Sequence, residues 1–320
     1  MKTVMNHFLS VALGASLGVT CCAAAENWGT DFEQGLATAE KLDRSVLVEF
    51  TGSDWCSACA VLESKVLPTK VFTDFVAKNK LVPVELDYPN AADKVSPEQR
   101  AKRNELSARY GITGFPTLLV VDSKGQPFGR IVGVIGSPEQ HVERLQAILD
   151  VRKAYKKQVN AARKLTGVEK AKALEAALNV LPADCRPLHS ALVDEIIGSD
   201  TDDVLGYRKA RDTKSLQDKQ LEEVKAALVQ AVGDRKFIHA IDDARAAAAK
   251  LLEREDLLPF VRLSLNVYIS QSYVMTNQLQ EALKYMDAAI AADPESAEAK
   301  EMQNRGRKML QDMISAQEQR

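Results

Sequence analysis

The chain has 320 residues, of which 46% are hydrophobic and 27% are charged, and its formal net charge at pH 7 is −2. This length allows two domains that each bury a core of their own. The nearly neutral charge argues against nucleic acid and anionic membrane surfaces as default partners, because both attract clustered lysine and arginine.

The first residues have the pattern of an export signal. Lys2 precedes FLSVALGASLGVT, an uncharged apolar run that is short for a membrane span. Ala23 and Ala25 suit the positions before a signal-peptidase cut, which predicts a signal peptide over 1–25 and a mature chain that begins at Glu26. The sequence therefore predicts a periplasmic or secreted protein with no membrane span after signal removal.

Two alternatives compete with cleavage, namely an uncleaved anchor and lipidation at Cys21 or Cys22. The residues before either cysteine (LGVTC) fit a lipoprotein site poorly, so simple export is preferred. Export leaves Cys56, Cys59 and Cys185, too few cysteines for a disulfide-stapled scaffold. Cys185 is interpreted as a buried small hydrophobic residue in a helical region.

Helix and strand patterns alternate over 26–150, which predicts an α/β domain with a mixed sheet. Ser-Pro-x-Gln at 96–99 and at 137–140 is a capping signature that marks two helix starts. After an amphipathic segment over 32–42, the expected elements are a buried strand over 45–50, helical turns after the cysteine pair with a break near Pro68, a strand over 81–88, a helix over 96–110, a hairpin of strands over 117–122 and 129–134, and a helix from 137 to about 165.

The character of the sequence changes at about residue 151. No strand pattern follows, and alanine, leucine, lysine, glutamate and glutamine recur at helical spacing. We therefore predict an all-helical domain over 151–320, with the helix from 137 to about 165 crossing the boundary. Residues 263–296 resemble one tetratricopeptide unit, and the segment SAEAKEMQNRGRKML resembles its capping helix. The alternative is a plain helical bundle.

The pair Cys56 and Cys59, in FTGSDWCSAC, has three interpretations: a metal site, a structural bridge or a reactive dithiol. Zinc requires four ligands, and the other candidates are all single: Cys185, His141, His189 and His239. No metal is therefore expected. A bridge between residues three positions apart closes a very small loop and stabilises the fold little.

The dithiol interpretation explains more of the pattern. A strand followed by DWCSAC places Cys56 at the N-terminus of a helix, where free N–H groups and the helix dipole favour a thiolate. The thiolate is the species that attacks disulfides. Cys59 lies one turn further along the helix, is expected to be less exposed, and is placed to resolve the mixed disulfide.

VLVEFTGSDWCSAC, followed some 55 residues later by YGITGFPTLLVVDSKG, resembles the thioredoxin family, and more narrowly exported bacterial members with a GSDWC segment. The resemblance covers roughly 27–150 and implies a thioredoxin fold. It also implies a cis peptide between Phe115 and Pro116 beside the dithiol. The resemblance further implies that Gly114, Phe115 and Pro116 bind an extended substrate chain. It also implies that Trp55 packs over the site.

The resemblance further implies a proton role for Glu49, since the family carries a buried acid on this strand. Here Glu49 precedes Cys56 by seven residues rather than six, so its side chain has two expected outcomes: a proton relay to Cys59, or a polar residue at the strand edge. Asp54, in the loop, is the alternative proton carrier.

The sequence thus predicts an exported thiol–disulfide oxidoreductase acting on protein disulfides, without a cofactor. Family members that are strong oxidants carry histidine between the cysteines, whereas this chain has Ser57 and Ala58, so a reductant or exchanger is expected. Its partners would be protein thiols or disulfides and a redox partner protein, with binding or dimerisation through the helical domain. The alternative is a non-catalytic thioredoxin-fold scaffold whose helical domain binds a protein.

Overall fold

The computed structural model describes residues 28–91, 94–233 and 240–319. The predicted signal peptide, Cys21, Cys22 and Glu26 lie outside the described residues. The chain folds as two compact units that divide between Thr201 and Asp202. The boundary expected at 150/151 falls inside one continuous helix, α5 (Pro138–Ala162). The next helix packs onto α5, and the helix after that packs onto its predecessor. The first unit therefore extends about fifty residues beyond the thioredoxin-like region.

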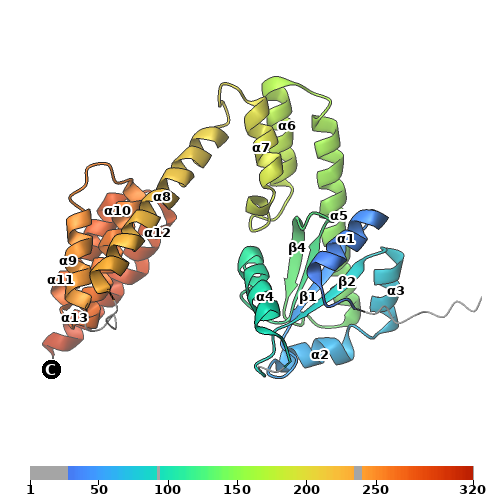
Figure 1. Ribbon diagram of the computed structural model, residues 1–320, viewed down its shortest axis with the longest axis horizontal. Helices are drawn as coiled ribbons and strands as arrows, with labels where there is room; N and C mark the ends of the chain where they lie inside the picture. The colour runs from blue at the N-terminus through green and yellow to red at the C-terminus, as the bar shows by residue number, and fades with distance from the viewer. Residues whose placement is uncertain (1–27, 92–93, 234–239, 320) are drawn as a thin grey trace, which may run out of the picture. The chain divides into compact units, whose positions relative to one another are not determined.

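The first unit contains the mixed sheet that the sequence predicts (Figure 1). Its strands lie in the order β2-β1-β3-β4, with β1 parallel to β2 and antiparallel to β3, and with β3 antiparallel to β4. The strands are β1 (Val46–Thr51), β2 (Val82–Asp87), β3 (Thr117–Val121) and β4 (Pro127–Val132).

The helices predicted from residues 96 and 137 begin and end close to the predicted bounds. Pro68 separates α2 from α3, and both predicted capping boxes are present, at the starts of α4 and α5. The helices are α1 (Phe32–Leu42), α2 (Ser57–Lys65), α3 (Lys70–Lys78), α4 (Pro97–Tyr110), α5, α6 (Gly167–Asn179), a 3₁₀ turn η1 (Arg186–Leu188) and α7 (Ser190–Ser199).

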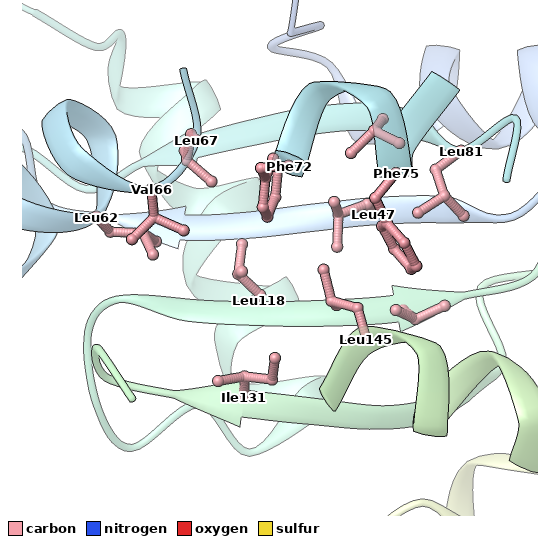
Figure 2. Close-up of a cluster of buried hydrophobic side chains, with 12 residues drawn as sticks. Leu47, Leu62, Val66, Leu67, Phe72, Phe75, Leu81, Leu118, Ile131 and Leu145 are labelled. Carbon is pink, nitrogen blue, oxygen red and sulfur yellow. The ribbon is translucent and has the colours of Figure 1, made fainter. Parts of the chain in front are cut away.

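One face of the sheet packs against α2, α3 and α5 (Figure 2). Leu47 of β1 and Leu118 of β3 meet Leu62, Phe72 and Leu145 from these helices, and all five side chains are buried. Since side chains alternate along a strand, Glu49 and Thr51 share this face with Leu47. The acid of β1 therefore lies on the side of the sheet that carries the cysteine helix.

The opposite face packs against α1 and α4. Val46 and Phe50 of β1 contact a cluster that includes Phe32 and Tyr110, whose rings meet edge to face with centroids 6.0 Å apart. The Tyr110 hydroxyl donates a 2.8 Å hydrogen bond to the Gly125 carbonyl in the β3–β4 turn. Helices thus cover both faces and leave the loops at the ends of the strands to form the site.

The connection between α6 and α7 is attached to β4 by buried polar contacts. The His189 ring lies 3.1 Å from the Tyr155 hydroxyl through Nδ1 and 2.8 Å from the Pro127 carbonyl oxygen through Nε2. Cys185 lies nearby in sequence as a free, fully buried thiol, and burial raises its pKa to about 11. This confirms the prediction of a buried cysteine in a helical region.

The second unit is helical throughout its described residues, as predicted (Figure 1). Each helix packs against its neighbour in sequence, and α10 and α11 form a hairpin with extensive contacts. The elements are α8 (Tyr207–Val232), α9 (Ile241–Leu251), α10 (Pro259–Met275), α11 (Leu279–Ala292), α12 (Ala297–Glu301), a π-helical turn η3 (Met302–Gly306) and α13 (Arg307–Glu318).

The hairpin α10–α11 occupies the segment interpreted as a tetratricopeptide unit. Ala282 and Ala289 are fully buried between its helices, and the Ser270 hydroxyl donates a 2.7 Å hydrogen bond to the Ala282 carbonyl. The rings of Tyr273 and Tyr285 stack with centroids 5.6 Å apart. The segment expected to cap the unit forms α12, η3 and the start of α13. The repeat assignment itself stays a prediction.

Candidate functional site

The two cysteines lie where the sequence predicts, at the start of the helix that follows β1. Cys56 is the N-cap residue of α2, and the Cys59 backbone N–H donates to the Cys56 Sγ over 3.1 Å. The two sulfurs are joined in a disulfide, with the Cα atoms 5.2 Å apart. In the reduced state the same free N–H groups and the helix dipole would favour a thiolate at Cys56.

The two sulfurs differ in access as expected. Cys56 is half-buried, whereas Cys59 is fully buried. The first turn of α2 carries no acidic residue that would oppose a negative charge on Cys56. An incoming disulfide can therefore reach Cys56 first, and Cys59 is placed to act on the intermediate afterwards.

The sheet brings the proline loop to the same end as the cysteines. Phe50, at the end of β1, pairs with Thr117, at the start of β3, so the segments after one and before the other share a sheet edge. The peptide between Phe115 and Pro116 is cis, which confirms the expectation. The loop is held by hydrogen bonds from the Thr117 hydroxyl to the Gly114 carbonyl (2.8 Å) and from the Gly133 N–H to the Pro116 carbonyl (2.7 Å).

Trp55 joins the cysteine loop to the proline loop. Its ring meets Phe115 edge to face with centroids 5.3 Å apart, and Phe115 meets Tyr88 at the same distance. The indole remains 47% exposed. A Cβ atom added at Gly52 would lie 2.4 Å from the indole ring, so Gly52 provides the space in which Trp55 rests. These contacts place an exposed aromatic surface directly beside Cys56.

The extra residue in the GSDW segment is held by polar contacts with the segment after β2. Ser53 donates to the Asp87 carboxylate through its N–H (2.9 Å) and its hydroxyl (2.7 Å). The Asp54 carboxylate accepts the N–H groups of Asn90 (2.9 Å) and Ala91 (3.0 Å), which lowers its pKa. Asp54 is thus engaged in bracing this loop, and Glu49 is the stronger candidate for the proton carrier.

Glu49 is fully buried, and neither carboxylate oxygen has a hydrogen-bond partner in the described part of the chain. Burial raises its pKa to about 8, and the nearby carboxylates of Glu63, Glu85 and Asp87 act in the same direction. A carboxyl with such a pKa exchanges its proton near neutral pH, as general acid–base chemistry requires. Of the two outcomes expected for Glu49, the structure therefore favours an inward-facing acid over a strand-edge residue.

The comparisons with known proteins agree with this geometry. A family model described as a thioredoxin-like domain matches residues 32–149. The curated protein "Disulfide bond reductase DsbH" of Chlamydia pneumoniae is 32% identical over 143 residues, which cover 44% of this chain and 84% of that protein. The chain belongs to the thioredoxin family. It is a thioredoxin-like thiol–disulfide oxidoreductase, and the region that matches contains the CxxC-spaced pair Cys56 and Cys59.

Two further similarities accompany this match. "Thioredoxin-related protein DsbJ" of Chlamydia pneumoniae is 27% identical over 123 residues, which cover 36% of this chain and 35% of that protein. The solved structure "DsbH Oxidoreductase" is 30% identical, covers 43% of this chain and 95% of that chain, and has a TM-score of 0.37. The thioredoxin-family model ends at residue 149, before the second unit begins.

Sequence reasoning missed Glu63 and Glu85, which line a cavity of about 330 Å³ together with Glu49. A signal for Glu85 was present, because it is a charged residue in the middle of a predicted strand. Within the described ranges, no group of three histidine, cysteine, aspartate or glutamate side chains could hold a metal ion. Nor does any described helix combine the length and hydropathy needed to cross a membrane.

Proposed function

We propose that this thioredoxin-family protein reduces or exchanges protein disulfides outside the cytoplasm, with Cys56 as nucleophile and Cys59 as resolving cysteine. The observation that carries the proposal is the position of Cys56: half-buried at the first turn of α2, with an N–H group directed at its sulfur. Cys59, by contrast, is fully buried behind it.

The reaction has two displacement steps. The Cys56 thiolate attacks one sulfur of a substrate disulfide, forms a mixed disulfide, and releases the other substrate sulfur as a thiolate that takes up a proton. Cys59 then loses its proton and attacks the Cys56 sulfur. This step forms the Cys56–Cys59 disulfide and releases the second substrate thiol. Two electrons pass from the protein dithiol to the substrate, and a redox partner protein must later return two electrons.

The direction of the reaction is proposed from the residues between the cysteines. Ser57 and Ala58 offer no cation that would stabilise the reduced thiolate, so the pair is expected to be a reductant or exchanger rather than a strong oxidant. The relative named as a disulfide bond reductase supports the same direction. The reduction potential of the Cys56–Cys59 couple is the direct measurement.

The substrate chain is proposed to bind across Trp55 and the loop of Gly114, Phe115 and Pro116. Gly114 and Phe115 are half-buried and precede the first paired residue of β3, so their backbone can receive an extended chain as a short added strand. Trp55 offers exposed apolar surface next to Cys56 for a side chain that flanks the substrate cysteine.

Glu49 is proposed to accept the proton of Cys59 in the second step and to return it in the reverse reaction. Its burial on the face of β1 that α2 covers, and a pKa of about 8, support this role. Because Glu49 acts on the second step, its loss should slow resolution of the mixed disulfide and leave the first attack by Cys56 unchanged.

Export through a signal peptide over 1–25, with a mature start at Glu26, remains part of the proposal. Relatives of the Dsb type and the GSDWC segment support a periplasmic location. The mass of the mature protein from an export-competent host tests it: a chain beginning at Glu26 is expected, and a full-length or lipid-modified chain would contradict it.

The helical unit is proposed to bind a protein partner or a second copy of the chain, with 263–296 as a tetratricopeptide-like unit. Support comes from the hairpin α10–α11 and its tyrosine pair. The non-catalytic scaffold is less well supported, because both cysteines stand beside Trp55 and the proline loop. A scaffold would bind its partner equally well after both cysteines are replaced by serine.

A trapping experiment tests the proposed function. The variant Cys59→Ser is expected to accumulate mixed disulfides with substrate proteins, because the resolving thiol is absent. The matched variant Cys56→Ser should trap none, since Cys59 is fully buried. Failure of the wild-type protein to exchange any model disulfide, together with alkylation of Cys56 as slow as that of free cysteine, would contradict the proposal.

A further inference from the structure

Three carboxylates from two strands and a helix meet in one cavity beneath the cysteine helix. In the parallel pairing of β1 with β2, Glu49 stands directly opposite Glu85, so both side chains leave the sheet on the same face. Glu63, from α2, completes the group, and all three line the cavity of about 330 Å³. The remaining lining residues are mostly apolar and come from α3, the connection between α2 and α3, and the segment before α1.

The three acids differ in their access to solvent. Glu49 is 0% exposed and lines the cavity, and neither of its carboxylate oxygens has a hydrogen-bond partner in the described part of the chain. Glu63 and Glu85 are half-buried, so their carboxylates reach the surface. Glu63 is fixed by the Thr51 hydroxyl, which donates a 2.6 Å hydrogen bond to it. A cavity of this volume, lined by polar oxygens, has room for several water molecules.

The charges that act on Glu49 are all negative. Strand β2 contributes Glu85 and Asp87, helix α2 contributes Glu63, and the residue opposite Glu49 on β3 is Leu118. The positive charge of Arg103 acts on Glu85 and opposes the rise of its pKa. Negative charges around a buried carboxyl oppose its ionisation, so Glu49 holds its proton to a higher pH than an exposed glutamate does.

We propose that Glu63 and Glu85 carry protons between Glu49 and solvent through this cavity during thiol–disulfide exchange. The inference rests on the proposed proton role of Glu49. When Cys59 attacks Cys56, its thiol proton passes to the Glu49 carboxylate, while the bonding electrons remain with sulfur. The proton then moves over cavity water to Glu85 or Glu63 and leaves to solvent. Glu63 and Glu85 act through Glu49 and never touch the sulfurs.

A route for the proton is needed because Glu49 is buried. A Glu49 that has taken the Cys59 proton must lose it before the next cycle, yet its own oxygens have no contact with solvent. Glu63 and Glu85 are the half-buried carboxylates of the cavity, so they can accept this proton and pass it to solvent. The neighbouring charges also keep Glu49 protonated up to a higher pH than burial alone would.

The test follows single-turnover reduction of a chromogenic aromatic disulfide, which releases one coloured thiol when Cys56 attacks and a second when Cys59 resolves. The variants are Glu49→Gln, the double variant Glu63→Gln with Glu85→Gln, and the surface control Glu40→Gln. At low buffer concentration, the double variant should slow the second release about 10-fold and leave the first unchanged. A small buffer such as imidazole should restore the second release to within about 2-fold, because it replaces the route.

A second readout is the pH dependence of the second release. Glu85→Gln removes the charge opposite Glu49, so the pH of half-maximal rate should fall by about one unit. If the double variant shows the wild-type rate of second release while Glu49→Gln is slow, the route through Glu63 and Glu85 is overturned and the role of Glu49 stands. The same conclusion follows if the double variant is slow and the buffer does not restore its rate. A wild-type rate in Glu49→Gln would contradict the proton role of Glu49 and the route together. Absence of either release in wild type would contradict the proposed function.

Discussion

The indole Nε1 of Trp55 donates a 2.7 Å hydrogen bond to the backbone carbonyl of Tyr88, 33 residues further along the chain. The residue before the nucleophile is thus held by the segment that follows β2. That segment is held in turn from α4, because Arg103 donates to the Asp87 carbonyl and Arg100 donates to the Pro89 carbonyl. The cysteine loop is therefore positioned by side chains of a helix on the far face of the sheet.

Gly52→Ala should displace the Trp55 ring. The added Cβ would lie 2.4 Å from the indole, closer than side-chain carbons approach, and overpacking of this kind costs about 1–3 kcal/mol. We expect a changed tryptophan emission spectrum and slower disulfide exchange, with the Cys56–Cys59 disulfide still able to form. Emission spectra and exchange rates measured on the same samples check this.

The matched control is Gly198→Ala, in α7. A Cβ there meets nothing within 4 Å, so the helix should gain up to about 1 kcal/mol and the exchange rate should not change. An unchanged spectrum and rate in Gly52→Ala would mean that Trp55 takes no part in positioning the loop.

Asp54→Asn should loosen the cysteine loop without unfolding the domain. The neutral amide oxygen is a weaker acceptor for the N–H groups of Asn90 and Ala91, and the 3.5 Å ion pair with Lys94 is lost. We expect faster hydrogen exchange at these two amides and a several-fold slower reaction of Cys56. Asp74→Asn, at an exposed helix residue paired with Lys70, serves as the control and should change neither the amide exchange nor the reaction of Cys56.

The sequence was sufficient for the fold and the dithiol because both depend on local patterns. Capping serines, the break at Pro68 and the apolar run of β1 each act within a few residues, and Cys56 and Cys59 share one helical turn. The contacts of the GSDW segment could not be foreseen, since Asp54 meets residues 36 and 37 positions away. They depend on the pairing of β1 with β2, which no local pattern specifies.

The acidic cavity was unforeseen for the same reason. Glu49 was identified by its strand, but its neighbours are set by the register that places Glu85 opposite it and by the packing of α2 that supplies Glu63. The end of the first unit was also set by packing. His189, the N-cap residue of α7, contacts Tyr155 and Pro127 across long separations, so the start of α7 is held against α5 and β4 although the sequence there is purely helical.

His189 should make the stability of the first unit depend on pH. Burial lowers its pKa below the ordinary 6.5, so the unfolded chain binds this proton more readily than the folded one. The contribution is complete above about pH 6.5 and is lost as the pH falls from there toward the lowered pKa. The free energy of unfolding, measured between pH 8 and pH 5, should fall with pH in this way. His189→Phe should remove this pH dependence and lower the free energy of unfolding by about 1–3 kcal/mol. Tyr155→Phe keeps the imidazole and should keep the slope.

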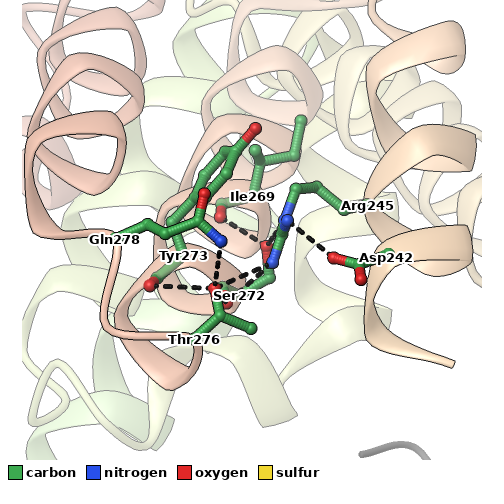
Figure 3. A network of polar contacts seen from close by, with 7 residues as sticks. All are labelled: Asp242, Arg245, Ile269, Ser272, Tyr273, Thr276 and Gln278. Atoms are coloured by element: carbon green, nitrogen blue, oxygen red, sulfur yellow. Dashed lines mark hydrogen bonds and ion pairs between the residues drawn. The ribbon is translucent and has the colours of Figure 1, made fainter. Parts of the chain in front are cut away.

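Arg245 joins α9 to α10 in the second unit through both charge and ring contact (Figure 3). Its guanidinium lies 4.0 Å from the Tyr273 ring centroid and donates to the Ser272 hydroxyl and carbonyl and to the Thr276 hydroxyl. An ammonium group cannot reproduce this planar set of donors, so Arg245→Lys should destabilise the unit by about 1–2 kcal/mol.

Hydrogen exchange of the α9 and α10 amides measures this loss directly. Arg245 contacts Asp242, Ser272, Tyr273 and Thr276, which all lie in the second unit, so the exchange rate of the Cys56–Cys59 pair should not change. Arg305→Lys is the matched control, because Arg305 is exposed and pairs only weakly with Glu301 at 3.4 Å. If the α9 and α10 amides are equally protected from hydrogen exchange in Arg245→Lys and Arg305→Lys, charge alone holds α9 to α10, and the planar geometry of Arg245 contributes nothing.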